Sequence, residues 1–311
     1  MRKELLFTID ALPYRQPIPV YGYYFGSEEK KLAVMGAIRG DEFQQMYTAA
    51  KLVQKLSALE KEGRLAADCG ILVIPCAGQF SMNVSHRFWP LDNTDINRMF
   101  PGYDEGETTQ RLAWRIFESL RGYEYGVHLT SLYLPGDFVP HVRIMDTGLQ
   151  KNEEGLDFGL PYLVIRKPRP YDTTTLNYNW QSWETRTFSL YTRATESIDE
   201  ESARMGADGV LRFLSKRGML SCTDLPKGED TLEFSEKNLV SVQSKSGGIL
   251  LYDRKVSEHV KRGELLGRIV DPYTAETTEE LRAPQDGVLF FARHAQIISA
   301  HTVVFRIIPA A

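Results

Sequence analysis

The chain has 311 residues, of which 42% are hydrophobic and 25% are charged, and its formal net charge at pH 7 is −4. This composition is typical of a globular protein of about two domains. The slightly acidic balance gives no electrostatic reason to expect nucleic acid or an anionic membrane as a partner. Because the three cysteines lack metal-site spacing and no apolar run reaches about 18 residues, we expect a cytoplasmic protein with free thiols.

Strand and helix patterns alternate along the first two thirds of the chain. Apolar runs of strand length lie at residues 18–25, 32–38, 70–75, 123–129, 162–165 and 188–191, and helical patterns lie at 43–62, 107–120 and 201–217. A continuous apolar strand between helices is typical of a parallel strand that is buried on both faces. The sequence therefore predicts an α/β domain with a mainly parallel sheet.

The turn between the second predicted strand and the first predicted helix carries Arg39, Asp41 and Glu42. Residues at the carboxyl ends of parallel strands line the ligand crevice of an open α/β sheet, so two acids and an arginine there suggest a site. The alternative is a helix cap, in which Asp41 accepts helix N–H groups and Glu42 complements the helix dipole. Taken alone, these residues favour the cap.

Residues 77–106 form a long predicted loop that is rich in turn-forming, polar and aromatic residues. Loops of this length in compact domains are generally functional or disordered, and the aromatic residues argue against disorder. We therefore expect this loop to contribute to a site.

A separate all-β domain is predicted after a polar, linker-like stretch at residues 223–236. Within it, the sequence GILL at 248–251 is echoed by GVLF at 287–290. Two similar half-units of paired strands indicate a small barrel or sandwich. We place the two domains at residues 1–225 and 226–311.

Three motifs resemble those of the succinylglutamate desuccinylase/aspartoacylase family of zinc-carboxypeptidase-like proteins. Residues 36–42 (GAIRGDE) stand where that family has G-x-H-G-[DN]-E, residues 95–102 (DINRMFPG) are similar to its D-L-N-R-x-F-P-G, and residues 127–129 (VHL) are similar to its D-L-H segment. The resemblance extends from about residue 18 to residue 308. It implies a mixed, mainly parallel sheet flanked by helices, followed by a biotinyl/lipoyl-like, barrel-like all-β domain.

In that family, zinc is held by the histidine and glutamate of the first motif and by the later histidine, and a fourth position is open for water. The resemblance implies that Glu42 and His128 are metal ligands, while Arg39 stands at the position of the first histidine. A guanidinium offers only hydrogen-bond donors and cannot ligate zinc, so Arg39 would pair with a neighbouring acid instead. The candidates for a replacement ligand are His86, His141 and Asp41, each of which is also explained as an ordinary hydrogen-bonded side chain.

The substrate-anchoring part of the family pattern is retained. Asn97 and Arg98 match the pair that grips the free carboxylate of the substrate, a task that suits the planar fork of arginine. The alternative to substrate binding is that Arg98 forms a structural ion pair with Asp92 or Asp95.

The proton-transfer part of the pattern differs. Arg87 is a counterpart of the upstream arginine that stabilises the oxyanion, but the general-base position falls on Thr192, which cannot act as an equivalent base. Glu196 is the only acid near this position. The alternative interpretation is that Glu196 is an ordinary solvated loop residue.

The C-terminal domain has no lysine in the hairpin around residues 274–280, where a biotin or lipoyl carrier would need one. We therefore expect a structural or lid-like domain that carries no prosthetic group.

Two functions follow as hypotheses. The first is a zinc-dependent hydrolase of N-acyl amino acids or similar small carboxylated amides, in which Glu196 shuttles the proton and Arg87 faces the oxyanion. The second is a non-catalytic family member with a degenerate metal site, in which Arg39 and Arg98 bind a small carboxylate or another anion. The sequence leaves open the acyl group, turnover and whether the chain forms a homo-oligomer.

Overall fold

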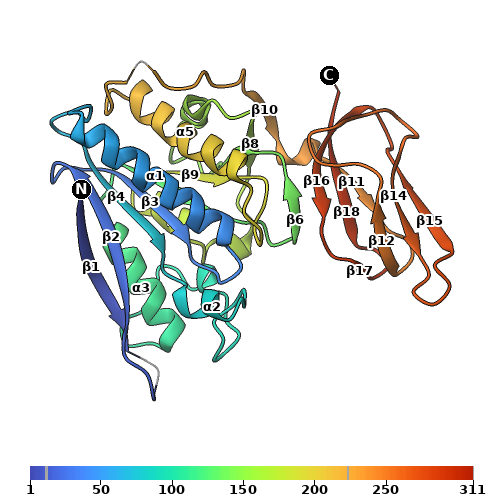
Figure 1. Ribbon diagram of the computed structural model, residues 1–311, viewed down its shortest axis with the longest axis horizontal. Helices are drawn as coiled ribbons and strands as arrows, with labels where there is room; N and C mark the ends of the chain where they lie inside the picture. The colour runs from blue at the N-terminus through green and yellow to red at the C-terminus, as the bar shows by residue number, and fades with distance from the viewer. Residues whose placement is uncertain (11–12, 223, 311) are drawn as a thin grey trace. The chain divides into compact units, whose positions relative to one another are not determined.

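The computed structural model describes residues 1–10, 13–222 and 224–310 (Figure 1). The chain divides into two compact units, the first made of Met1–Ser131 and Pro140–Glu233 and the second of Leu132–Val139 and Phe234–Ala311. The first unit thus ends at Glu233, whereas the sequence placed a boundary at residue 225. The short segment Leu132–Val139 belongs to the second unit although it lies in the middle of the first unit's sequence, and no sequence pattern indicated this.

A nine-stranded sheet forms the framework of the first unit, with the strand order β1-β2-β4-β3-β5-β9-β7-β8-β10. The strands are β1 (Arg2–Ile9), β2 (Ile18–Gly26), β3 (Lys30–Ala37), β4 (Gly70–Cys76), β5 (Tyr125–Leu129), β7 (His141–Met145), β8 (Tyr162–Arg166), β9 (Arg186–Tyr191) and β10 (Leu232–Ser235). The central strands β4, β3, β5 and β9 are parallel neighbours, and so are β7 and β8. The pairs β1–β2, β2–β4 and β7–β9 are antiparallel. The predicted mixed, mainly parallel sheet is confirmed.

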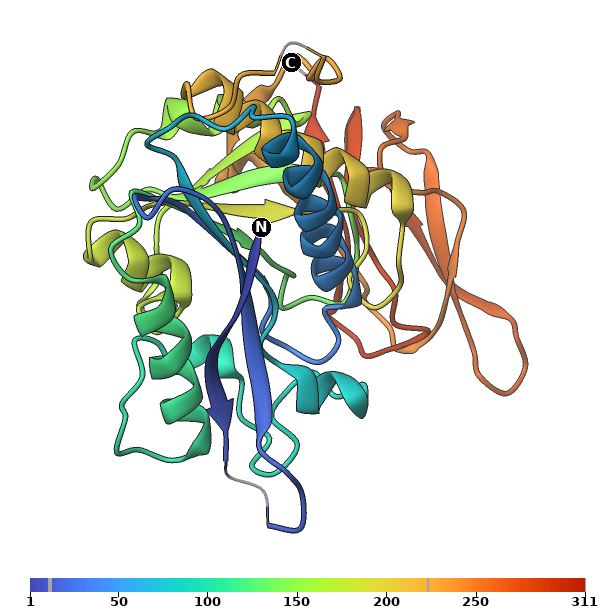
Figure 2. The ribbon, with the colours of Figure 1, turned by 60° about the vertical axis from the view of Figure 1, so that its left-hand side comes forward.

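Helices cover both faces of this sheet. On one face lie α1 (Phe43–Lys61) and α5 (Glu200–Lys216), which pack side by side and are seen in blue and gold in Figure 2. On the other face lie α3 (Thr108–Leu120) and α4 (Leu176–Ser182). None of the helices in the described ranges is long and apolar enough to cross a membrane.

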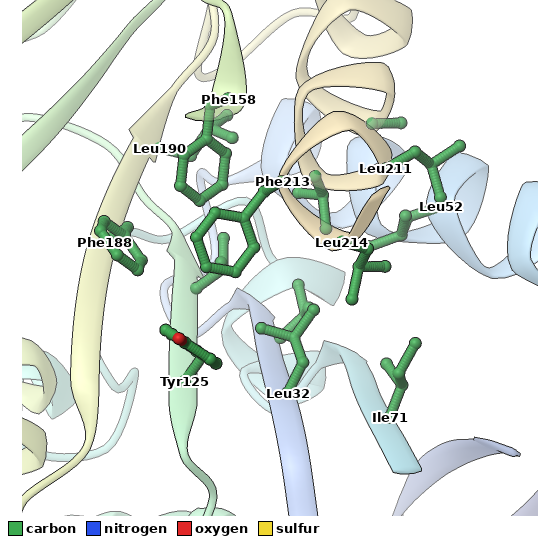
Figure 3. Close-up of a cluster of buried hydrophobic side chains, with 14 of the residues drawn as sticks. Leu32, Leu52, Ile71, Tyr125, Phe158, Phe188, Leu190, Leu211, Phe213 and Leu214 are labelled. Carbon is green, nitrogen blue, oxygen red and sulfur yellow. The ribbon is translucent and has the colours of Figure 1, made fainter. Parts of the chain in front are cut away.

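The alternation of side chains along β3 and β4 explains this layered arrangement. Leu32 and Val34 belong to the core beneath α1 and α5, whereas Ala33 and Met35 belong to the core beneath α3 and α4. Successive residues of a strand point to opposite faces, so a continuous apolar run supplies both cores. The aromatic centre of the first core is Phe213, whose ring lies 4.6 Å from that of Phe158 (Figure 3).

The second unit consists of two sheets of mainly short antiparallel strands. One sheet has the order β11-β18-β16-β13 with β6 (Gly136–Phe138) paired to β16, and the other has the order β15-β14-β12-β17. The strands are β11 (Val240–Gln243), β12 (Gly248–Tyr252), β13 (His259–Val260), β14 (Leu265–Val270), β15 (Thr277–Arg282), β16 (Gly287–Arg293), β17 (Ile297–Ile298) and β18 (Val303–Pro309). The two echoed sequences thus begin β12 and β16, one in each sheet. The predicted all-β character is confirmed.

Replacing Phe213 by alanine should destabilise the first unit by about 3–5 kcal/mol, because the substitution opens a cavity in a core that cannot collapse fully. Phe213 is fully buried and also contacts the rings of Tyr125 and Phe188. Urea denaturation followed by circular dichroism should show the shift. The exposed Leu149 provides the control, since Leu149→Ala should change the free energy of unfolding by less than about 0.5 kcal/mol. Equal midpoints for the two variants would contradict the assignment of this core.

Candidate functional site

The turn between β3 and α1 carries the first group of site residues. Glu42 is the N-cap residue of α1, but its Oε2 accepts hydrogen bonds from the backbone N–H groups of Ile38 at 2.9 Å and Arg39 at 3.0 Å, which precede the helix. Asp41 accepts a hydrogen bond from Nη1 of Arg87 at 2.6 Å. The expectation that Asp41 caps the helix is therefore wrong, because a guanidinium holds its carboxylate instead.

Glycine is required where this turn meets the loop that follows β4. A Cβ atom on Gly40 would lie 2.3 Å from the carbonyl oxygen of His86 and 2.4 Å from that of Ser81. Such distances exclude any side chain at this position. The close approach brings the long loop predicted at residues 77–106 against the turn that holds Glu42.

Arg39 links two acidic residues from distant parts of the sequence. Its Nε and Nη2 atoms each donate to one oxygen of Asp95 at 2.9 Å, and its Nη1 donates to Oε1 of Glu42 at 3.2 Å. Burial would lower the pKa of Arg39, but the charges of Asp95 and Glu42 outweigh it and raise the pKa above its ordinary value. Arg39 is therefore a permanent buried cation, and bidentate pairing fixes its position.

Ser131, which follows β5, joins the hydrogen-bond network that consists of Arg39, Asp41, Glu42, Arg87 and Asp95. Its hydroxyl donates to Oε1 of Glu42 at 2.6 Å and accepts from Nη1 of Arg87 at 3.4 Å. Burial would raise the pKa of Glu42, but the charge of Arg39, with smaller effects of His128, Arg87 and the Ser131 hydroxyl, lowers it below the ordinary value. Glu42 is thus an ionised carboxylate that is fully surrounded by donors.

His128 lies on β5 in register with Met35 of β3, and its side chain is fully buried. Nδ1 of the ring lies 2.8 Å from Oδ1 of Asn177, whereas Nε2 has no hydrogen-bond partner in the part of the chain that the structure describes. Burial, opposed by the charge of Glu42, lowers the pKa of His128 to about 4. The imidazole is therefore neutral at pH 7 and, with Nδ1 donating to Asn177, it presents a lone pair at Nε2.

The predicted substrate-anchoring residues lie on the short 3₁₀ helix η1 (Ile96–Arg98). Asp95 caps this helix by accepting a hydrogen bond from the backbone N–H of Asn97 at 3.0 Å, with the same carboxylate that Arg39 holds. Arg98 donates to the carbonyl oxygen of Tyr171 at 2.7 Å and lies 3.7 Å from Asp172. The acid beside Arg98 is therefore Asp172, and the alternative pairing with Asp92 or Asp95 is wrong.

The side chains of the other predicted site residues have different surroundings. His86 is exposed and its Nε2 lies 3.0 Å from Oδ1 of Asn93, while His141 is buried and its ring stacks on that of Tyr191 at 4.5 Å. Glu196 is exposed and makes no hydrogen bond or ion pair with any other described residue. Thr192 is buried after β9, and its Oγ1 lacks a hydrogen-bond partner within the described ranges.

These side chains do not fit a catalytic zinc ion. Such a site needs three protein ligands and an open position, and no three His, Cys, Asp or Glu side chains within residues 1–10, 13–222 and 224–310 are grouped to hold a metal. The guanidinium of Arg39 already donates to Glu42 at 3.2 Å, where it would repel a divalent cation bound to the same carboxylate.

Sequence reasoning missed three partners of the network. Ser131 follows His128 by three positions, but its bond to Glu42 depends on the pairing of β5 with β3. Asn177, the partner of His128, comes from α4, about fifty positions later in the chain. Gln45 in the first turn of α1 donates through Nε2 to the carbonyl oxygens of Thr130 and Ala194. No spacing rule joins such distant residues.

Two comparisons of the sequence with known proteins found similar proteins. Residues 28–129 match the model of the succinylglutamate desuccinylase/aspartoacylase catalytic domain. The N-alpha-acetyl-L-2,4-diaminobutyric acid deacetylase of Halomonas elongata is 24% identical over 268 residues, which cover 82% of this chain and 75% of the relative.

Solved structures share the fold. A succinylglutamate desuccinylase from Silicibacter sp. TM1040 superposes with a TM-score of 0.81 at 20% identity, covering 98% of this chain and 94% of that one. The product-bound ectoine utilization protein EutE (DoeB) from Ruegeria pomeroyi superposes with a TM-score of 0.78 at 18% identity, covering 94% and 90%. From the match of residues 28–129 to its catalytic domain, the chain belongs to the succinylglutamate desuccinylase/aspartoacylase family, whose members include desuccinylases and deacetylases of N-acyl amino acids.

Proposed function

We propose that the chain binds a small carboxylated amide of the N-acyl amino acid class at a site that does not need a metal ion. The observation that carries this proposal is the pairing of Arg39 with Glu42 and with both oxygens of Asp95. A fixed guanidinium supplies the positive charge that zinc supplies in typical members of the family. It neutralises the buried acids without leaving a coordination position for water.

The carboxylate end of the ligand is assigned to Arg98. Its side chain is 31% exposed, and the bond to Tyr171 uses only part of a guanidinium with five N–H donors. Arg39 supports this assignment indirectly, because it holds the Asp95 carboxylate that caps η1. Arg39 is therefore a positioning residue for Asn97 and Arg98 and does not itself grip the ligand.

The relative from Halomonas elongata supports the ligand class. Its name describes deacetylation of an N-acetylated amino acid that carries a free carboxylate. A site that retains Asn97 and Arg98 can bind the carboxylate of such a molecule even when Arg39 replaces a metal ligand.

Zinc-dependent hydrolysis of the same class of molecules is the second candidate. One observation favours it: Nε2 of the buried His128 has no hydrogen-bond partner among the described residues, and His128 and Glu42 influence each other's pKa. This function requires Arg39 to leave Glu42 and a third ligand to take its place. Glu196 would then have to move from its exposed position to shuttle the proton.

Metal content separates the two candidates. The protein should be purified without chelators, incubated with zinc, and analysed by mass spectrometry for metal and by chromatography for hydrolysis of N-acetyl amino acids. We expect no stoichiometric zinc and no turnover. About one zinc per chain together with amide hydrolysis would establish the second candidate.

Arg98→Ala should abolish discrimination between a carboxylate and a neutral amide. We expect the wild-type protein to bind Nα-acetyl-L-norvaline about tenfold more tightly than its carboxamide, which is the usual difference for one charged hydrogen bond. Ligand-observed NMR titration measures both affinities. Arg121 is exposed and paired with Glu118 on the surface, so Arg121→Ala should retain the discrimination. Equal affinities in the wild-type protein would argue against a carboxylate site.

Arg39→His should create zinc affinity, because the substitution removes the cation beside Glu42 and adds an imidazole ligand. Isothermal titration with zinc should detect binding in this variant and none in the wild-type protein. Arg39→Gln is the matched control, since it removes the charge without adding a ring nitrogen. Identical titrations of Arg39→His and Arg39→Gln would mean that the turn does not have the geometry of a metal site.

Arg39→Ala should lower the free energy of unfolding by about 3–5 kcal/mol, since it leaves two acids of the network without their buried partner. Chemical denaturation measures the change. The matched surface variant Arg121→Ala breaks an exposed pair and should cost at most about 1 kcal/mol. If Arg39→Ala is as stable as the surface variant, the ion pairs do not hold this turn.

A further inference from the structure

A cavity of about 510 Å³ is lined by residues of β1, β2 and α3, which lie side by side in the first unit (Figures 1 and 2). Its lining includes Lys30 and Gly70, the first residues of β3 and β4, and Tyr123, which precedes β5. The candidate site follows the opposite ends of β3 and β5. The 8 residues of β3, about 25 Å of extended chain, therefore separate the cavity from the turn that carries Glu42.

Aromatic rings form part of the cavity wall. Tyr24, Trp114 and Tyr123 all line it. Cationic groups of the chain already lie over two of these rings: Cζ of Arg2 is 5.5 Å from the centre of the Tyr24 ring, and Nζ of Lys30 is 5.5 Å from that of Tyr123. The face of an aromatic ring attracts a cation within about 6 Å, so the wall of this cavity suits positively charged groups.

The hydroxyl groups of the two tyrosines are available to a ligand. Tyr123 is only 5% exposed, and neither its hydroxyl nor that of Tyr24 makes a hydrogen bond with another described residue. Burial raises the pKa of both hydroxyls, and the carboxylates of Glu4 and Glu28 raise it further. At Tyr24 the guanidinium of Arg2 opposes this effect in part. Both hydroxyls are therefore protonated at pH 7, and each can accept a hydrogen bond from an N–H group.

Carboxylates outnumber cationic groups in the lining. Four glutamates line the cavity with three cationic side chains, those of Arg2, Lys30 and Arg115. Two of the glutamates share one guanidinium, because Arg2 donates through Nε to Glu4 at 2.6 Å and through Nη1 to Glu28 at 2.7 Å. The lining thus carries one negative charge in excess, which favours a positively charged ligand.

We propose that this cavity is a second binding site of the chain and that it takes an organic cation of the guanidinium type. A guanidinium is planar, stacks on aromatic faces and has five N–H donors for carboxylate and hydroxyl oxygens. The contacts of Arg2 with Tyr24, Glu4 and Glu28 provide the pattern for such a ligand. The site is separate from the proposed carboxylate site and does not depend on it.

Three matched probes test the proposal on the full-length protein by ligand-observed NMR titration. They are n-butylguanidinium, the neutral n-butylurea of nearly the same shape, and the anion pentanoate. We expect the guanidinium to bind about tenfold or more tightly than the urea, and pentanoate to bind most weakly. Equal affinities for the guanidinium and the urea, tighter binding of pentanoate, or no detectable binding of the guanidinium at millimolar concentration would overturn the proposal.

Glu28→Gln locates the cation, because it removes one carboxylate of the lining. The side chain of Glu28 is 82% exposed, so the variant should fold. Its affinity for n-butylguanidinium should fall about threefold or more, while that for n-butylurea should not change. The matched control is Glu62→Gln, which removes a surface acid that is paired with Arg64 outside the cavity. Equal affinities of the two variants for the guanidinium would refute the location.

Arg2→Met should have the opposite effect. The side chain of Arg2 is 53% exposed and uses the carboxylates that the ligand would use, so its removal should raise the affinity for n-butylguanidinium about threefold or more. Arg64→Met, which breaks the exposed pair with Glu62, should leave this affinity unchanged. An affinity of Arg2→Met no higher than that of Arg64→Met would mean that the cation does not bind beside Arg2.

Competition separates this cavity from the candidate site. An excess of Nα-acetyl-L-norvaline, the probe of the carboxylate site, should not displace n-butylguanidinium. Displacement would place both ligands at one site and overturn the proposal of a second site.

Discussion

The buried guanidinium of Arg39 is the interaction on which the site depends. It joins the end of β3 to the loop that carries Asp95, through two hydrogen bonds of 2.9 Å, and it neutralises Glu42 at the start of α1. A charge buried to this extent persists only when paired and hydrogen-bonded. The arrangement of the turn, the loop and η1 is therefore one electrostatic unit, and a change in any of its parts affects the others.

At residue 39 the family resemblance implies a histidine, and the arginine found there has a different chemistry. A metal ion offers a coordination position at which water can be activated, whereas a guanidinium offers donors in fixed directions. Beside Arg39, Glu42 is an ionised carboxylate: burial would raise its pKa, but the guanidinium lowers it. In this chain the side-chain partners of Glu42 are therefore the guanidinium of Arg39, at 3.2 Å, and the hydroxyl of Ser131, at 2.6 Å.

The rigid sheet explains why such a network can be maintained. Both faces of β3 and β4 are covered by apolar cores, so the carboxyl end of β3 has little freedom to move. Gly40 admits no side chain because backbone atoms of the following loop approach it. The site is thus held by packing on one side and by paired charges on the other.

Much of the framework was predictable from the sequence. Local sequence signals predicted β3, β4, β5 and α1. A strand that is buried on both faces is a continuous apolar run, and a helix that is buried on one face repeats apolar residues with a period of 3.6. The motif at residues 95–102 likewise singled out Asn97 and Arg98 as candidates, a prediction that follows from the family resemblance. The N-terminal strand β1, by contrast, begins with four exposed residues and lacks such a signal.

The sequence by itself determined the layered α/β fold, the all-β second unit and the presence of an arginine on the turn that carries Glu42. Only the tertiary structure decided which acids Arg39 contacts, that Asp41 is held by Arg87 rather than by the helix, and that His128 is paired with Asn177. The physical reason is that periodicity and motifs record the local environment of each residue, whereas hydrogen-bond partners depend on strand register and loop approach between segments far apart in the chain.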